Sequence, residues 1–155
     1  MSNPSKQRGT AAETAVLRHV RDNGFPWAHR LALTGNADQG DISLLPGNLV
    51  ILEVKSHASA ATGQPGDAQL ADWMRQTRTE RVNAGADYGV LVVKRKGTTD
   101  PGRWWSYVTA GQFAMLLGAD LDLPNPHAPL CLSLASLLPV LRQAGYGQEL
   151  EEATA

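Results

Sequence analysis

The sequence predicts a single α/β domain, an α/β/α sandwich built around a central mixed β-sheet. Short apolar runs with the composition of β-strands, such as residues 88–94, alternate with amphipathic stretches of helical period, such as residues 67–84. The chain has 155 residues and is 43% hydrophobic, which is ordinary for one globular domain with a core of its own.

The N-terminal stretch predicts a loose arm followed by a helix. Residues 1–9 are polar, and Thr10 to Glu13 have the form of a capping box that opens a helix ending at Asn23-Gly24. Glu13 lies within roughly 60° of the apolar stripe of this helix on a helical wheel, so it is expected on the inward face. Glu13 could therefore cap the helix, serve a functional site, or do both.

Two apolar β-type runs, residues 41–45 and 49–56, flank the turn Pro46-Gly47-Asn48 and predict a β-hairpin. With a three-residue loop, Ser43 faces Ile51 and Asp41 faces Glu53, whereas a two-residue loop would put Asp41 opposite Leu52. Lys55 shares the face of Glu53 because strand side chains alternate. We therefore expect two carboxylates and one lysine to converge.

Such a cluster suits a hard divalent cation, because Mg²⁺ takes one or two carboxylates and keeps several waters. The alternative is a buried ion pair between Glu53 and Lys55 with a purely structural role. That alternative leaves Asp41 as an unbalanced charge on the same patch, so we favour the metal interpretation.

The remaining elements follow in chain order. Residues 25–33 are expected to form the first strand, and 67–84 a helix capped by Asp67 whose inward stripe is Leu70, Trp73, Met74 and Thr77. Strands are predicted at 88–94 and 104–108, with Trp104 and Trp105 on opposite faces, then a helix at 109–117 and a short edge strand at 130–132. The last helix runs from Ser136 to 144 with Pro139 in its first turn, and residues 145–155 are expected to be disordered. The domain limits are thus an arm at 1–9, one domain at 10–144 and a tail at 145–155.

Composition narrows the functional classes. The single cysteine, Cys131, excludes an internal disulfide and a cysteine-based zinc cluster, and no signal-peptide or membrane-span pattern occurs, so a cytoplasmic protein is expected. The net charge is −1, but residues 1–103 carry 13 Lys and Arg against 10 Asp and Glu, while residues 104–155 carry 1 against 5. A polyanion would therefore bind the first two-thirds of the chain. No phosphate-binding loop and no acyl-transfer triad is present.

Several motifs, taken in order, resemble the PD-(D/E)XK nuclease superfamily, and within it the archaeal-type and phage-encoded Holliday-junction resolvases. They are Glu13 on a helix, Gly40-Asp41 at the start of a strand, Glu53-Val54-Lys55 on the next strand, and the amphipathic helix that follows. The likeness covers residues 8–94. Gly40 stands where the superfamily name places Pro.

The resemblance implies a restriction-endonuclease-like core and a metal-dependent endonuclease that hydrolyses DNA phosphodiester bonds, cutting four-way junctions as a homodimer. It implies Mg²⁺ or Mn²⁺ held by Asp41, Glu53 and the Val54 carbonyl, with Glu13 completing the metal or water shell. Lys55 would position the attacking water. A glutamine of the following helix often supports such sites, and Gln69 and Gln76 both qualify.

DNA contacts are expected at polar and basic positions around this cluster. Every third residue of one helix face is basic, and a second basic cluster follows strand 88–94; either could track phosphates or be a solvated surface. The candidates are Arg8, Thr34, Ser56, Arg75, Arg78, Lys94, Arg95 and Lys96. The alternatives are a restriction-type, exonucleolytic or repair nuclease of the same superfamily, or a non-catalytic DNA-binding protein on the same fold.

Overall fold

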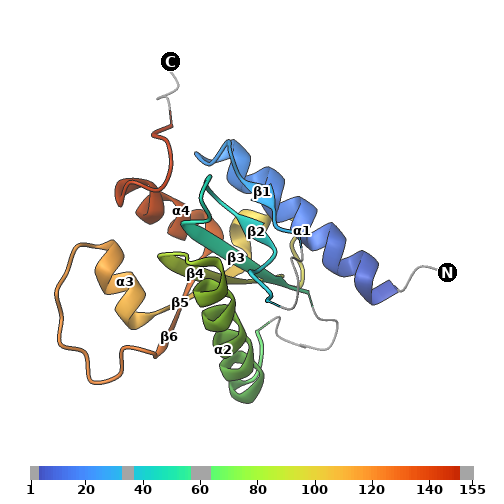
Figure 1. Ribbon diagram of the computed structural model, residues 1–155. Helices are drawn as coiled ribbons and strands as arrows, with labels where there is room; N and C mark the ends of the chain where they lie inside the picture. Colours follow the sequence, from blue (N-terminus) through green and yellow to red (C-terminus); the bar gives the residue numbers. More distant parts are fainter. Residues whose placement is uncertain (1–3, 33–36, 57–63, 151–155) are drawn as a thin grey trace.

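Figure 1 shows the computed structural model of the chain, which describes residues 4–32, 37–56 and 64–150. One six-stranded sheet has the order β1-β2-β3-β4-β5-β6. Its strands are β1 (His29–Arg30), β2 (Ile42–Ser43), β3 (Val50–Lys55), β4 (Tyr88–Val93), β5 (Trp105–Thr109) and β6 (Pro129–Ser133). The helices are α1 (Pro4–Asp22), α2 (Asp67–Ala84), α3 (Ala110–Leu116) and α4 (Leu134–Gln143), with the short 3-10 helix η1 (Pro101–Arg103) before β5.

The sheet is mixed, because β3 and β4 are parallel whereas every other neighbouring pair is antiparallel. Helix α2 makes the crossover between the two parallel strands, which is the connection that parallel neighbours require. This arrangement confirms the predicted α/β fold with a mixed sheet.

Helices cover both faces of the sheet (Figure 1). Helices α1 and α4 pack on one face through a core that includes Val16, Val20, Leu52 and Leu138, and Trp104 joins it. Helix α2 covers the other face, where its predicted inward stripe packs on a smaller core, and Trp105 lies on that side. The two adjacent tryptophans therefore point to opposite faces, as predicted.

Helix α1 begins earlier than expected. It starts at Pro4, so the predicted loose arm at 1–9 is wrong from residue 4 onward, and residues 1–3 lie outside the described residues. Pro is tolerated in the first turn of a helix, and the following residues are mostly good helix formers. Thr10 therefore lies inside the helix, where its carbonyl accepts a hydrogen bond from the Thr14 hydroxyl at 2.9 Å. Glu13 is consequently not a capping residue.

The first two strands and the last helix differ in extent from the prediction, and α2 differs in its N-cap. The first strand, predicted over 25–33, is reduced to β1, and β2 likewise has two residues. Helix α2 has Gly66, not Asp67, at its N-cap. Helix α4 begins at Leu134, where the Ser133 hydroxyl caps it, so Pro139 lies inside the helix and not in its first turn.

The C-terminal segment is packed where disorder was predicted. The Gln148 N–H donates to the Gly24 carbonyl at 2.8 Å, and the Tyr146 hydroxyl donates to Asp87 at 2.8 Å. The Tyr146 ring also meets Tyr88 edge to face. Residues 145–150 are therefore part of the domain, and residues 151–155 lie outside the described residues.

Candidate metal centre

The turn between β2 and β3 has the predicted register. Ser43 pairs with Ile51 and Ile42 with Leu52, which are the partners that a three-residue loop requires. Gly47 and Asn48 adopt positive φ angles of 81° and 55°, conformations that glycine and asparagine tolerate best. This register brings Asp41 to the side of β3 next to Glu53.

Asp41 is fixed at the edge of β3 by two hydrogen bonds. Its backbone N–H donates to the Leu52 carbonyl at 2.9 Å, and its Oδ2 accepts from the Val54 N–H at 2.8 Å. The carboxylate thus occupies the place that a backbone carbonyl of a longer β2 would take. Because the N–H and C=O of one strand residue point to the same side, the Val54 carbonyl also faces this edge.

Glu53 and Lys55 form an ion pair on the face of the sheet that α2 covers. Lys55 Nζ lies 2.9 Å from Glu53 Oε1, and Glu53 is 5% exposed. Gln76 Nε2 on α2 approaches the same Glu53 oxygen at 3.5 Å, a long contact. Of the two glutamines that the sequence left open, Gln76 therefore reaches the cluster, whereas Gln69 is exposed.

The carboxyl groups of Asp41 and Glu53 both resist ionisation. Burial, followed by the negative charge of Glu53, raises the pKa of Asp41 to about 7, although the Val54 N–H opposes the shift. Burial, followed by interaction with the Glu80 carboxyl, raises the pKa of Glu53 to about 8, although Lys55 opposes the shift. A positive charge placed between these two groups would oppose both shifts, because it favours the ionised form of each carboxyl.

Glu80 on α2 belongs to the cluster and was missed from the sequence. It is 1% exposed, and its Oε1 accepts a hydrogen bond from Gln76 Nε2 at 3.0 Å. Burial is the main cause that raises its pKa. Glu80 follows Trp73 and Thr77 at helical spacing on the predicted inward stripe, so the argument that placed Glu13 inside could have found it.

Glu13 lies at the margin of the cluster. Its Oε2 is 4.0 Å from the Arg30 guanidinium, and its side chain is partly exposed. Burial, followed by the charge of Asp41, raises the pKa of Glu13, while Arg30 lowers it. Glu13 is therefore close enough for the charge of Asp41 to affect its pKa. It does not form a three-residue metal-binding group with Asp41 and Glu53 among the described residues.

Within residues 4–32, 37–56 and 64–150, no three His, Cys, Asp or Glu side chains are grouped so that they could hold a metal ion. A metal would instead have the carboxylates of Asp41 and Glu53, the Val54 carbonyl and water. That donor set consists of oxygens alone, and the Oε2 of Glu53 is buried without a hydrogen-bond partner in the described part of the chain. Mg²⁺ fits these residues, because it needs few carboxylates and retains waters.

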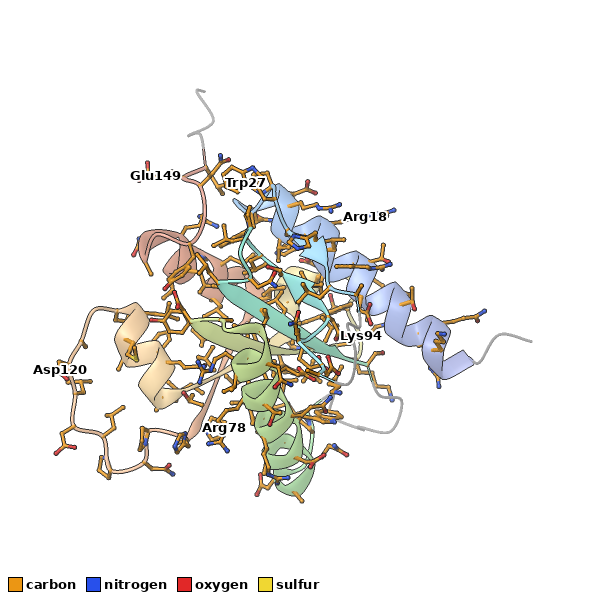
Figure 2. All side chains as sticks on the ribbon, viewed as in Figure 1. Arg18, Trp27, Arg78, Lys94, Asp120 and Glu149 are labelled. Atoms are coloured by element: carbon orange, nitrogen blue, oxygen red, sulfur yellow. The ribbon has the colours of Figure 1, made fainter. Side chains whose placement is uncertain are left out.

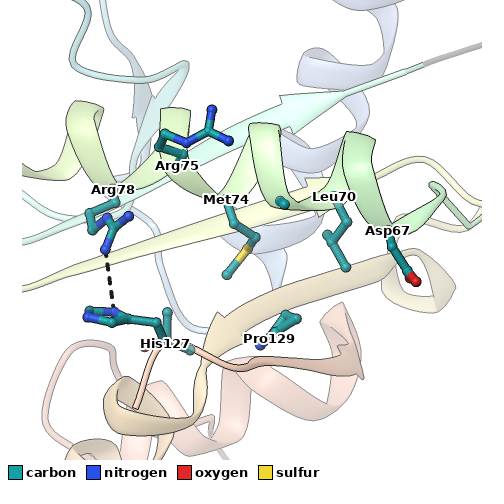
Figure 3. Close-up of a pocket in the computed structure, with 9 residues that line it drawn as sticks. Asp67, Leu70, Met74, Arg75, Arg78, His127 and Pro129 are labelled. Carbon is teal, nitrogen blue, oxygen red and sulfur yellow. Dashed lines mark hydrogen bonds between the residues drawn. The ribbon is translucent and has the colours of Figure 1, made fainter. Parts of the chain in front are cut away.

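Two candidate DNA-contacting arginines lie on the exposed surface of α2, and Arg75 lines a pocket together with Gln76 and Glu80. Arg75 forms an exposed ion pair with Asp72 at 3.0 Å. Arg78 points across a pocket of about 460 Å³ toward His127 and is 3.5 Å from its Nδ1 (Figure 3). Leu70, Met74 and Pro129 supply the apolar part of that pocket (Figure 3).

The basic cluster after β4 lies nearer to Lys55. The Lys94 N–H donates to the Lys55 carbonyl at 2.9 Å, so the chain leaves β4 beside the end of β3. The Lys94 ammonium lies 5.7 Å from the Trp104 ring and the Arg95 guanidinium 4.4 Å from the Trp105 ring. These are cation–π contacts, which orient the two cations.

The remaining candidates for DNA contact are dispersed. Lys96 is exposed, Ser56 is partly exposed beyond β3, and Arg8 is exposed on α1. Figure 2 shows Lys94 on the same side of the molecule as the lower part of α1, and Arg78 beside α2. Thr34 lies outside the described residues.

Fold and site together define an α/β protein with an open mixed sheet and a largely buried cluster of carboxylates and one lysine, located where β2 begins and β3 ends. Comparison with protein families, curated proteins and solved structures finds no match. Within the described residues, no helix combines the length and apolar character needed to cross a membrane.

Proposed function

We propose that this protein is a divalent-metal-dependent DNA endonuclease whose preferred substrate is a branched DNA such as a four-way junction. The observation that carries the proposal is the convergence of Asp41, Glu53 and Lys55 from two neighbouring strands. A buried acid, a partly buried acid and a lysine, with a strand carbonyl beside them, are groups that suit metal-assisted phosphodiester hydrolysis.

Each residue has a role that follows from its position. Asp41, Glu53 and the Val54 carbonyl would hold Mg²⁺ or Mn²⁺, which lowers the pKa of a water and offsets charge on the phosphate. Lys55 Nζ is partly exposed and lies 2.9 Å from Glu53, so it can orient the attacking water and stabilise the charge that develops on the phosphate. Glu13, held by Arg30, would orient water at the margin.

DNA as the substrate is supported by the basic residues next to Lys55. Lys94 and Arg95 leave β4 beside Lys55, and ring contacts hold both side chains, so they can contact phosphates flanking a scissile bond. A two-fold homodimer would place two such centres on opposite strands, as paired incision of a four-way junction requires. Junction selectivity and the dimer rest on the sequence resemblance.

A panel of substrates tests this proposal. The full chain is incubated with labelled four-way junction, nicked flap and linear duplex, each with Mg²⁺ or with EDTA, and the products are resolved on denaturing gels. We expect Mg²⁺-dependent, paired incision of the junction and little cutting of linear duplex.

The other outcomes of the panel separate the alternatives. Equal cleavage of linear duplex would remove junction selectivity and favour a restriction-type, exonucleolytic or repair nuclease. Salt-sensitive DNA binding with no cleavage on any substrate would contradict the endonuclease proposal and favour a non-catalytic DNA-binding protein.

A further inference from the structure

Arg78 is a sequence candidate for DNA contact to which the proposed function gives no role. Its guanidinium points across the pocket between α2 and β6, where it makes one long hydrogen bond, of 3.5 Å, to His127 Nδ1 (Figure 3). Among the ion pairs of the described residues, none joins Arg78 to a carboxylate. A guanidinium has five N–H donors, so Arg78 keeps several donors and an unbalanced charge for an anion that enters the pocket.

Two further donors line the Arg78 end of this pocket, and they come from other elements. The hydroxyl of Thr109, the last residue of β5, accepts from the Gln112 N–H at 3.1 Å, so its own proton can be donated to a ligand. His127 lies in the loop before β6, and its Nε2 carries the ring proton when Nδ1 accepts from Arg78. A guanidinium, a hydroxyl and an imidazole N–H together suit the acceptor oxygens of a phosphate.

The rest of the pocket suits a flat ring with an amino group. Leu70 and Met74 on α2 lie across from Pro129 at the start of β6, so apolar atoms line two sides. Figure 3 shows Asp67 at the far end from Arg78, about 16 Å away along the axis of α2. The carboxylate of Asp67 can accept a hydrogen bond from an amino group, whereas it would repel a second phosphate.

The dimensions of the pocket favour a single nucleotide over a strand. Its volume of about 460 Å³ lies in the range of small-ligand sites. The contact between Arg78 and His127 separates it from a second pocket of about 320 Å³, which both residues also line. A continuous DNA strand would have to pass through this contact, whereas a mononucleotide can fill one pocket and place its phosphate against it.

We propose that the pocket between α2 and β6 binds a free nucleoside monophosphate. The phosphate lies at the end formed by Arg78, Thr109 and His127. The base lies between the two apolar sides, with its amino group directed toward Asp67. None of the described residues that line this pocket belongs to the proposed metal centre, so binding requires no metal ion.

Isothermal titration of the full chain in EDTA tests the site, because EDTA removes any metal-dependent hydrolysis from the measurement. The ligands are deoxycytidine monophosphate, deoxyuridine monophosphate, deoxycytidine and inorganic phosphate. Deoxycytidine monophosphate should bind best. The nucleoside and inorganic phosphate should each bind about tenfold more weakly or worse, because each lacks one half of the contacts. Deoxyuridine monophosphate should bind several-fold more weakly, because a carbonyl replaces the amino group that meets Asp67.

Two exposed side chains provide the variants, so that folding is unaffected. Arg78→Ala should weaken the binding of deoxycytidine monophosphate by about tenfold or more, while Arg18→Ala, which removes the same charge from α1, should leave it unchanged. Asp67→Ala should abolish the preference for deoxycytidine monophosphate over deoxyuridine monophosphate. Asp120→Ala, on the loop after α3, should keep that preference. Circular dichroism confirms that the variants are folded.

Four results would overturn this inference. They are no binding of deoxycytidine monophosphate at millimolar concentration, equal affinity for inorganic phosphate, equal affinity in Arg78→Ala and wild type, or a preference for the nucleotides that Asp67→Ala does not change. Oligodeoxycytidylate that binds more tightly than the mononucleotide, and loses affinity in Arg78→Ala, would assign the pocket to a DNA strand instead. Each of these results leaves the proposed nuclease centre standing, because its metal ligands take no part in the titration.

Discussion

Asp41 and Glu53 are acids whose surroundings disfavour the ionised form of the carboxyl group. Both have pKa values raised well above those of free carboxyls, to about 7 and about 8, mainly because they are buried. A folded protein keeps such a pair for a reason other than stability, because an uncharged pair of the same size would avoid the cost. Under the proposed function that reason is the binding of a cation, for which the Val54 carbonyl offers a further oxygen ligand.

The first prediction concerns these two acids. Asp41→Asn or Glu53→Gln should reduce Mg²⁺-dependent cleavage by on the order of 100-fold or more, because each removes a charged ligand while keeping the volume. DNA binding and the circular dichroism spectrum should stay unchanged. Rates of junction cleavage by single-turnover assay measure the effect.

Asp120→Asn is the matched control for this experiment, since Asp120 is exposed on the loop after α3 (Figure 2). It should cleave at the wild-type rate. A wild-type rate in either Asp41→Asn or Glu53→Gln would show that these acids hold no catalytic metal.

The second prediction concerns pH. Because the pKa values of Asp41 and Glu53 are higher in the folded chain than the unfolded values of 3.8 and 4.5, the folded chain binds more protons between pH of about 4 and 8. The free energy of unfolding in EDTA should therefore fall as pH rises through this window, by on the order of a few kcal/mol. Mg²⁺ should restore stability, and more at pH 8 than at pH 5. Guanidinium unfolding at both pH values measures this.

Asp41→Asn provides the internal check on that measurement. It removes one of the two groups, so the loss of stability between pH 5 and pH 8 should become smaller. A stability that rises with pH in EDTA, or a slope unchanged in Asp41→Asn, would contradict the assignment of the raised pKa values.

At the scale of the elements, the short approach to β2 determines where Asp41 lies. Gly40 has a φ of +95°, and a Cβ there would meet Ile51 Cδ1 at 3.2 Å and the Leu52 carbonyl at 3.3 Å. A side chain at this position would strain the backbone and clash with β3, the strand to which Asp41 is hydrogen-bonded. Gly40 therefore positions Asp41, the acid that we propose as a metal ligand.

The third prediction follows from this close approach. Gly40→Ala should destabilise the fold by about 1–2 kcal/mol, the cost of a side chain at positive φ, and should also weaken Mg²⁺ binding and slow cleavage. Gly47→Ala is the matched control, because Gly47 also has a positive φ but a Cβ there would meet no atom within 4 Å. It should lose similar stability and keep its metal affinity. Thermal unfolding and metal titration compare the two, and equal metal affinity in both would refute the role of Gly40.

The β2–β3 turn and register were predictable because they depend on neighbouring residues. Pro46, Gly47 and Asn48 define a local turn, and strand alternation then fixes the partners of Asp41. The start of α1 was mispredicted because the Thr10-to-Glu13 pattern occurs within a helix as well as at its start. Glu80 was missed because its interaction with Glu53 depends on the packing of α2 against β3. The sequence pattern of α2 alone does not contain that packing.

At the scale of the whole molecule, the C-terminal segment closes the end of the domain. Gln148 bonds to Gly24, Tyr146 bonds to Asp87, and a Cβ on Gly147 would collide with the Gly24 carbonyl and the Phe25 ring. These partners are more than fifty residues apart in sequence, so no local pattern in residues 145–150 could predict them. Compositional bias alone suggested disorder.

The fourth prediction concerns the charge distribution. Basic residues are concentrated in residues 1–103, and those beside Lys55 should contact phosphate. Arg95→Ala should weaken DNA binding and reduce the slope of log affinity against log salt by about 1, because one cation no longer meets a phosphate. Arg18→Ala, on the exposed side of α1 (Figure 2), removes the same charge and should leave the slope unchanged. Fluorescence anisotropy over a salt series measures this, and equal slopes for both variants would rule out a specific role for Arg95.

The two edge strands of the sheet differ in length. At one end β1 has two residues, whereas at the other β6 runs over five, from Pro129 to Ser133, with Leu130 and Cys131 exposed. A long edge strand exposes unpaired backbone N–H and C=O groups that can pair with another copy of the chain. Proline blocks such pairing only at the first residue of β6. Concentrated preparations should therefore tend to aggregate through β6. Replacing Leu130 with lysine would be a simple way to improve solubility during crystallisation.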